Sequence, residues 1–200
     1  MKLTYDKIVT YTFLIIIAIT TVWDIACRGG EKIPRIVLIL GTLLVLDVLF
    51  KRSFLRKSKM TYVAIVIFIF FSMYLANVLN FYGIEGYDKI LHLASGFLIG
   101  FIGFATYTYL FGSKKNTDIK PCAMVIFTIM FAIACAGAWE IWEFATDQLF
   151  GLTAQNGLGD TMYDIICGTL GGIFVTIPIY KYAKGYKNRI LDKLVSEIVD

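Results

Sequence analysis

The sequence predicts an all-α, polytopic membrane protein that forms a bundle of six transmembrane helices. Hydrophobic residues make up 58% of the 200 residues and charged residues only 17%, whereas soluble domains are nearer half apolar and a quarter charged. The apolar residues also gather in runs of about 20, the length at which a helix crosses the hydrocarbon core. Because the connections between these runs are short, we expect a single integral membrane domain over residues 1–200.

The six runs follow one another along the whole chain. The first comes after Lys2 and Lys7 and could suggest a signal peptide, but no small-residue cleavage site follows it, so we interpret it as an uncleaved membrane helix. Several runs are rich in β-branched residues, yet lipid favours helices because each helix satisfies its own backbone hydrogen bonds. The expected spans are 8–26, 33–50, 60–82, 88–111, 121–146 and 160–180, with a cytoplasmic tail over 181–200.

Basic residues predict the orientation. The segment "KRSFLRKSK" at 51–59 has five positive charges and no negative one, "SKKNTDIK" at 113–120 has three lysines against one aspartate, and the tail begins with several more basic residues. In a six-span bundle these segments share one side, which the positive-inside rule makes cytoplasmic. Both termini are therefore expected in the cytoplasm. We interpret the basic runs as topology signals rather than lipid-recognition sites, and a net charge of +4 does not indicate a nucleic-acid surface.

Polar side chains form one layer near the extracytoplasmic ends of the spans. In chain order the layer contains Asp24, Asn77, Asn80, Asp88, His92, Glu140, Glu143, Asp147, Asp160 and Asp164. Only Asp47, near the inner end of the second span, breaks the pattern. Placing acidic groups inside a membrane span costs free energy, and such groups usually face the bundle interior or water. We therefore interpret this layer as a candidate functional site.

The acids of the last three spans share helical faces with small residues. Asp88 and His92 are four residues apart, as are Asp160 and Asp164, so each pair lies on one face; Glu140 and Glu143 share a face by the same geometry. The small residues that continue these faces are Gly96, Gly100, Gly103, Ala132, Ala136, Gly168, Gly171 and Gly172. Because small residues let helices approach closely in lipid, we expect the three spans to pack together and enclose a polar pocket.

The residue types in this pocket suit a cation. Carboxylates cannot all be ionised at low dielectric without compensation by protons or a cation. Oxygen ligands with one imidazole suit Mg²⁺, Mn²⁺, Ca²⁺ or Zn²⁺, and a bound metal could polarise a phosphoryl or acyl oxygen or activate water. The candidate ligands are Asp88, His92, Glu140, Glu143, Asp160 and Asp164; the candidate catalytic residues among them are His92, as ligand or general base, Asp88 and Glu143.

Structural roles compete with this interpretation for several residues. Asp88 and Asp160 are equally well placed to stabilise the first turns of their helices. Asp24, Glu85 and Asp147 stand at helix ends or in loops, where we expect solvated surface positions. Trp139 and Trp142 are typical of the aromatic belt at a membrane interface.

Three segments, "YDKILHLASG", "WEIWEFA" and "GLGDTMYDIICGTLGG", resemble the YjdF-like inner-membrane proteins and, more distantly, the VanZ-like group. The matching positions are Tyr87, Asp88, His92, Gly96, Glu140, Glu143, Gly159, Asp160 and Asp164. Phe144 stands where the YjdF-like pattern has Trp, and the VanZ-like arginine before the last acid is absent. The resemblance implies a multi-pass protein of a prokaryotic cell membrane. It also implies a role at the outer surface of the cell envelope, since VanZ-like members are associated with resistance to lipoglycopeptides such as teicoplanin. It does not identify a reaction.

We therefore expect a polar site, open to the outer leaflet, that binds or acts on an envelope lipid or lipid-linked headgroup. If the protein is an enzyme, it would be a metal-dependent hydrolase or transferase. One alternative is a cation- or proton-coupled transporter, in which Asp47 would serve the cytoplasmic side. Another is a non-catalytic envelope protein of the VanZ-like resistance type. The sequence leaves open the substrate, the oligomeric state and whether the protein is an enzyme.

Overall fold

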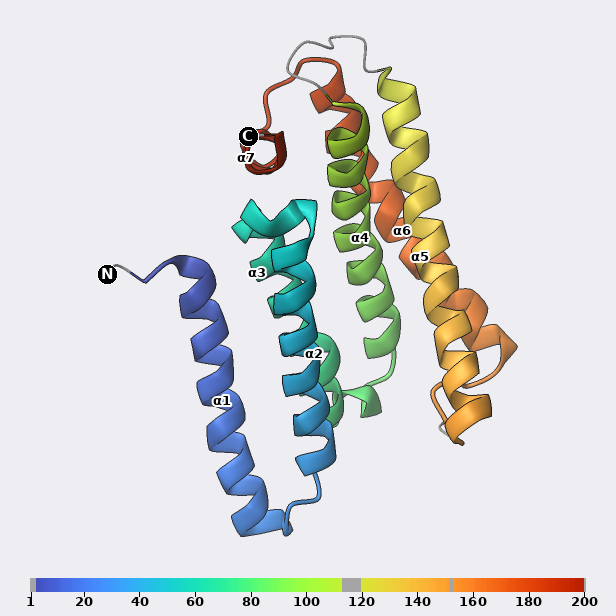
Figure 1. Cartoon of the computed structure of the whole chain (residues 1–200). Coiled ribbons are helices and arrows are strands. Elements are labelled where there is room, and N and C mark those ends of the chain that lie inside the picture. The colour runs from blue at the N-terminus through green and yellow to red at the C-terminus, as the bar shows by residue number, and fades with distance from the viewer. Residues whose placement is uncertain (1–2, 113–119, 152, 200) are drawn as a thin grey trace. The chain divides into compact units, whose positions relative to one another are not determined.

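The computed structural model describes residues 3–112, 120–151 and 153–199, which form helices and no strand. Six helical segments of this described part are long and apolar enough to cross a membrane. They are α1 (Tyr5–Arg28), α2 (Ile33–Arg52), α3 (Lys59–Ile69) continued by the π-helix η2 (Phe70–Val78), α4 (Tyr87–Phe111), α5 (Pro121–Phe150) and α6 (Leu158–Ala183) (Figure 1). The short helices are η1 (Phe54–Lys57), η3 (Phe81–Gly83) and α7 (Arg189–Val199). The predicted fold class is confirmed.

The six observed spans match the predicted ones apart from their ends. The third span stops at Val78 rather than 82, because Asn80 takes the left-handed conformation (φ 61°), which a helix cannot continue through. The fifth continues to Phe150, where Gly151 (φ 66°) caps it. The orientation of the termini stays a prediction, and Lys2 and residues 113–119, on which it partly rests, lie outside the described residues.

The predicted tail, 181–200, contains the amphipathic helix α7. Its Leu191 and Leu194 are buried, and α7 contacts α4. Contacts along the chain define two compact units, Met1–Glu85 and Gly86–Asp200. That residues 1–200 form one integral membrane domain stays a prediction.

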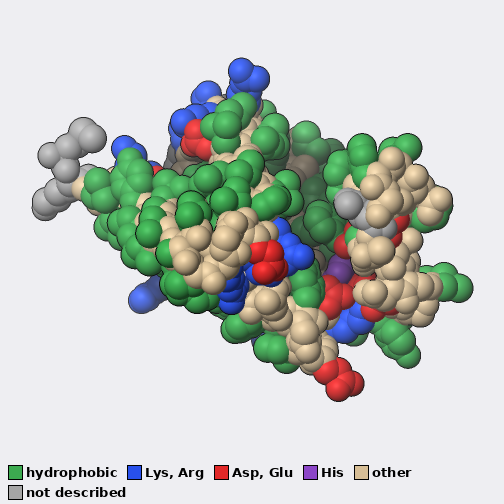
Figure 2. All heavy atoms as spheres, turned by 90° about the horizontal axis from the view of Figure 1, so that it is seen from below, with side chains coloured by type: hydrophobic (Ala, Val, Ile, Leu, Met, Phe, Trp, Pro, Cys, Tyr) green, Lys and Arg blue, Asp and Glu red, His purple; other side chains and the backbone are tan. Residues whose placement is uncertain are grey.

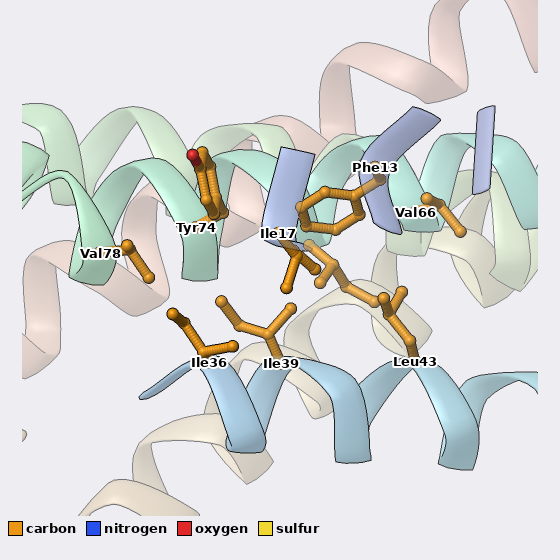
Figure 3. Packing of buried hydrophobic residues seen from close by; sticks show 9 residues of the cluster. Phe13, Ile17, Ile36, Ile39, Leu43, Val66, Tyr74 and Val78 are labelled. Carbon is orange, nitrogen blue, oxygen red and sulfur yellow. The ribbon is translucent and has the colours of Figure 1, made fainter. Parts of the chain in front are cut away.

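The first unit is held together by an apolar core among α1, α2, α3 and η2. Phe13 lies edge-on to Phe70 and Tyr74, with ring centroids 5.3 and 5.9 Å apart. Figure 3 shows the aliphatic side chains of the cluster around Phe13 and Tyr74. The core cluster is Phe13, Ile17, Ile36, Ile39, Leu43, Val66, Ile69, Tyr74 and Val78. Tyr74 keeps its polar group satisfied through a 2.6 Å hydrogen bond with Thr20, as a buried hydroxyl requires.

Asp24, expected at a solvated surface, is fully buried, so that expectation is wrong. The loop after α1 folds back over the helix end, and the backbone N–H of Lys32 donates to Asp24 Oδ2 at 2.9 Å. Lys32 is itself buried, and its ammonium donates to Asn80 Oδ1 at 3.0 Å and pairs with Glu31 at 3.1 Å. Asp24 therefore anchors a turn of the first unit.

In the second unit, α4, α5 and α6 pack against one another through the predicted small-residue faces. A Cβ added at Gly96 would overlap the backbone of Gly168, and one added at Gly171 would overlap the Leu93 carbonyl. A Cβ at Gly168 would lie 3.1 Å from the Ala136 Cβ, so α5 closes on the same contact. The predicted close packing of these three spans is confirmed, and glycine is what permits it.

We expect Gly96→Ala to lower the free energy of unfolding by about 1–3 kcal/mol, the usual cost of overpacking, because the added methyl group meets backbone that cannot move aside. Unfolding of the purified protein in detergent micelles, followed by circular dichroism, measures this. The matched control is Gly137→Ala on α5, where an added Cβ meets nothing within 4 Å. Equal stability of the two variants would contradict the proposed packing.

Candidate functional site

The candidate site lies at one end of the second unit, where α4 begins, α5 nears its end and α6 begins (Figure 1). Asp88 stands in the first turn of α4 and Asp160 in the first turn of α6. His92 and Asp164 follow one turn further into their helices, directly before the glycine contact between Gly96 and Gly168. The close helix approach therefore holds the polar side chains of α4 and α6 at the same level.

A lysine joins the acids of these two helices. The ammonium of Lys89 donates to Asp164 Oδ1 at 2.7 Å, to Asp88 Oδ2 at 3.3 Å and to Asp160 Oδ1. A single positive charge thus compensates carboxylates from both α4 and α6. Such pairing is what makes charged groups tolerable in a poorly solvated bundle interior.

Exposure falls steadily from the rim of the site to its base. The side chains of Asp88, Lys89 and Asp160 are 35%, 30% and 25% exposed. His92 is 13% exposed and Asp164 only 3%. Figure 2 views the molecule from this end and shows the single histidine, in purple, recessed among red acidic side chains. The site is therefore a pocket that opens at the helix ends.

His92 stands between the acids without a short hydrogen bond to either neighbour. Its Nε2 lies 3.6 Å from Asp164 Oδ1 and 3.7 Å from Asp88 Oδ1, both beyond ordinary hydrogen-bonding distance. The imidazole is instead at a distance at which one small ion could bridge it and these carboxylates. Nothing in these contacts commits it to one partner.

Glu140 on α5 is the least satisfied acid of the site. It is 4% exposed, and neither carboxylate oxygen has a hydrogen-bond partner among the described residues. The Thr161 hydroxyl, which accepts from Gln155 at 3.2 Å, lies beside this carboxylate as a weakly placed donor. Glu143, one turn away, accepts from Trp139 Nε1 at 2.8 Å. A buried carboxylate without a partner is costly when it is ionised, so either a proton or a bound cation would have to compensate Glu140.

The candidate ligands fall into two groups that share His92. One consists of Asp88, His92 and Asp164, and the other of His92, Glu140 and Glu143. Within each group the three ligand atoms lie no more than 4.8 Å apart, a spacing that metal–ligand bonds of about 2.0–2.5 Å can bridge. Asp160 belongs to neither group and contacts Lys89 instead. The predicted set of six ligands stays a prediction.

Asp147, expected as a solvated surface residue, shapes the loop between α5 and α6. Its carboxylate accepts from the backbone N–H groups of Ala154 and Gln155 at 2.8 and 3.0 Å. Gln155 in turn donates to the Glu140 carbonyl at 3.3 Å. Through this chain of contacts Asp147 links the loop to the segment of α5 that carries Glu140.

Lys89 and Trp139 are the residues that reasoning from the sequence missed. Lys89 is part of "YDKILHLASG" and lies three residues before His92, a spacing that puts both on one helical face. Trp139 precedes Glu143 by four residues, which is again a same-face spacing. These spacings could have indicated both residues. However, a lysine near the end of a membrane helix is equally typical of the membrane–water interface, and a tryptophan there is typical of the aromatic belt.

Comparison with known proteins supplies the family. A family model described as "Predicted membrane protein (DUF2238)" matches residues 8–185. The chain belongs to this family. An uncharacterized protein of Thermotoga maritima is 32% identical over 119 residues, which are 58% of this chain and 60% of the relative. The chain thus aligns with less than two thirds of that relative's length. No solved structure matches the chain.

The family and the six apolar helices together make this a multi-pass membrane protein. The family description agrees with the membrane character implied by the YjdF-like resemblance. The VanZ-like resemblance gains no support from these matches, and neither match names a reaction.

We expect Asp147→Ala to make the loop between α5 and α6 more mobile, because two backbone N–H groups lose a charged acceptor. The free energy of unfolding should fall by about 1–3 kcal/mol. Limited proteolysis with a protease of low specificity measures this as faster cleavage within 151–157. Glu85→Ala is the control, since Glu85 is exposed and outside this loop. Unchanged cleavage in Asp147→Ala would contradict the anchoring role.

Proposed function

We propose that this membrane protein holds one divalent cation between His92, Glu140 and Glu143 and uses it on the headgroup of an envelope lipid or lipid-linked molecule. The observation that carries the proposal is the Glu140 carboxylate, which is buried and accepts no hydrogen bond from the described residues. Either a proton or a cation compensates such a group in a low-dielectric site, and the ligand atoms of His92 and Glu143 within 4.8 Å favour a cation here.

The distribution of charge supports a cation at this point. Lys89 contacts Asp88, Asp160 and Asp164, so its charge is directed to the aspartates of α4 and α6. The Glu143 carboxylate accepts a hydrogen bond from Trp139, and the Glu140 carboxylate has the neutral Thr161 hydroxyl beside it. A metal ion bound by His92, Glu140 and Glu143 would supply the missing positive charge.

The ligand set narrows the choice of metal. Two carboxylates and one imidazole suit Mn²⁺ or Zn²⁺ better than Mg²⁺ or Ca²⁺, which prefer oxygen ligands throughout. Three protein ligands also leave at least one position for water or substrate, as in catalytic rather than structural zinc sites. The site is thus suited to polarising a substrate oxygen or activating a bound water.

A lipid headgroup fits the place of the site in the fold. The pocket opens where three membrane-spanning helices begin or end, the depth at which headgroup phosphates and esters are found. Trp139 and Trp142 on α5 are exposed at this level, as expected for residues at an interface. In this proposal Asp88, a partly exposed acid whose Oδ1 lies 3.7 Å from His92 Nε2, would accept the proton from a metal-activated water.

The transporter alternative depends on Asp47 as the acidic residue that would serve the cytoplasmic side of the membrane. Asp47 forms an exposed pair with Lys51 at 2.6 Å, one helical turn away on α2. An exposed pair of this kind is ordinary surface chemistry and gives transport no specific support. The non-catalytic alternative predicts that His92→Gln keeps the protein's cellular role, which separates it from the metal proposal.

We expect the wild-type protein, purified in detergent and stripped with chelator, to bind one Mn²⁺ per chain, and Glu140→Gln to bind it at least tenfold more weakly. Isothermal titration calorimetry with MnCl₂ measures both. Asp47→Asn is the control, since it removes an exposed carboxylate of α2 that belongs to neither candidate ligand group. Equal Mn²⁺ binding by Glu140→Gln and wild type, or none by wild type, would sink the metal proposal.

We expect metal-loaded protein in liposomes of phosphatidylglycerol, phosphatidylethanolamine and polyprenyl phosphate to release a headgroup or phosphate, because a metal-bound water can attack a phosphoryl or acyl centre. Mass spectrometry of the lipids before and after incubation detects the products. The control is Glu140→Gln in the same liposomes. Lipids that are unchanged by the wild type would contradict the enzymatic part of the proposal.

A further inference from the structure

The point occupied by the Lys89 ammonium has the surroundings of a cation site. Oxygen atoms of three aspartates converge on it, at 2.7 Å from Asp164, at 3.3 Å from Asp88 and at hydrogen-bonding distance from Asp160. They come from two helices, α4 and α6, that the glycine contact holds in place. Convergent carboxylates on facing helices are how helix bundles build sites for metal pairs.

The neighbouring group of His92, Glu140 and Glu143 differs in how its negative charge is compensated. It contains a buried carboxylate, Glu140, that no donor among the described residues compensates. Asp88 and Asp164 form a possible ligand group with His92, which also belongs to the glutamate group, so the two sets of acids adjoin in one pocket. One half contains a cation that is part of the chain, and the other half lacks one.

An ammonium can stand in for a metal ion in one respect only. It provides a compact positive charge with three donors, which satisfies three carboxylates. It provides no empty orbital that could polarise a substrate or activate water. A lysine at this point therefore offsets part of the negative charge of the three aspartates and occupies the place of a second metal ion without adding chemistry.

We propose that Lys89 occupies the place of a second divalent cation and thereby limits the pocket to a single metal ion. The inference rests on the proposed metal site at His92, Glu140 and Glu143. When the lysine charge is removed, Asp88, Asp160 and Asp164 become a carboxylate site for a second ion of the same class, one that accepts oxygen ligands, such as Mn²⁺. Lys89 is thus a positioning residue that makes this a one-metal rather than a two-metal centre.

The test is the Mn²⁺ stoichiometry of purified, chelator-stripped protein in detergent. We expect one Mn²⁺ per chain for wild type and for Lys89→Arg, which keeps the charge, and two for Lys89→Met, which keeps the length of the side chain without the charge. Electron paramagnetic resonance gives a second readout, since two neighbouring Mn²⁺ ions produce an exchange-coupled spectrum that a single ion lacks. Lys89→Met in combination with Asp160→Asn should bind the second ion at least tenfold more weakly.

The outcomes separate the inference from the function on which it rests. Wild type without bound Mn²⁺ contradicts the proposed function. Wild type with one ion and Lys89→Met also with one ion overturns the role of Lys89 alone. If Lys89→Met is unstable when produced without metal, Mn²⁺ in the growth medium and buffers should restore it, because the ion replaces the lost charge. Failure of Lys89→Met and of Lys89→Gln to accumulate even with Mn²⁺ would also overturn the inference.

Discussion

The contact between Gly96 on α4 and Gly168 on α6 is the constraint on which the second unit depends. Because the two backbones touch, a side chain larger than hydrogen at Gly96 has no room. The contact fixes both the distance between the helices and their relative rotation. One turn away, it places His92 and Asp164 opposite each other, with Nε2 and Oδ1 3.6 Å apart. Without so close an approach, the acids of α6 would lie out of reach of the lysine and histidine of α4.

Charge compensation then divides the pocket into two halves with different properties. The aspartates of α4 and α6 share the ammonium of Lys89, which makes their burial tolerable. The glutamates of α5 stand on the third helix of the same bundle, and Glu140 is left without a partner among the described residues. A membrane protein that keeps an unpaired buried acid beside its single histidine has the properties expected of a functional site.

The first unit uses similar polar groups for a structural purpose. Asp24 is as deeply buried as Asp164, and its Oδ2 accepts the backbone N–H of Lys32 and so anchors a turn, while its Oδ1 has no hydrogen-bond partner among the described residues. Lys32 is satisfied by Asn80 and Glu31. The difference between the two units lies in the partners: backbone groups and side chains of the connections between helices in the first, and convergent side chains of separate helices in the second. Burial of an acid alone therefore does not identify a site.

The sequence by itself determined the membrane character, the six spans, the small-residue faces and the level of the acids along each helix. These follow from the length of apolar runs and from the 3.6-residue period, which are properties of single helices. The ends of the third and fifth spans were less predictable, because they depend on the left-handed conformations of Asn80 and Gly151. Only the tertiary structure decided which acids receive the Lys89 charge, that Glu140 receives none and that Asp24 is buried. Those outcomes depend on how helices are rotated against one another and on how a loop folds back, and the pattern within one helix carries no information about either.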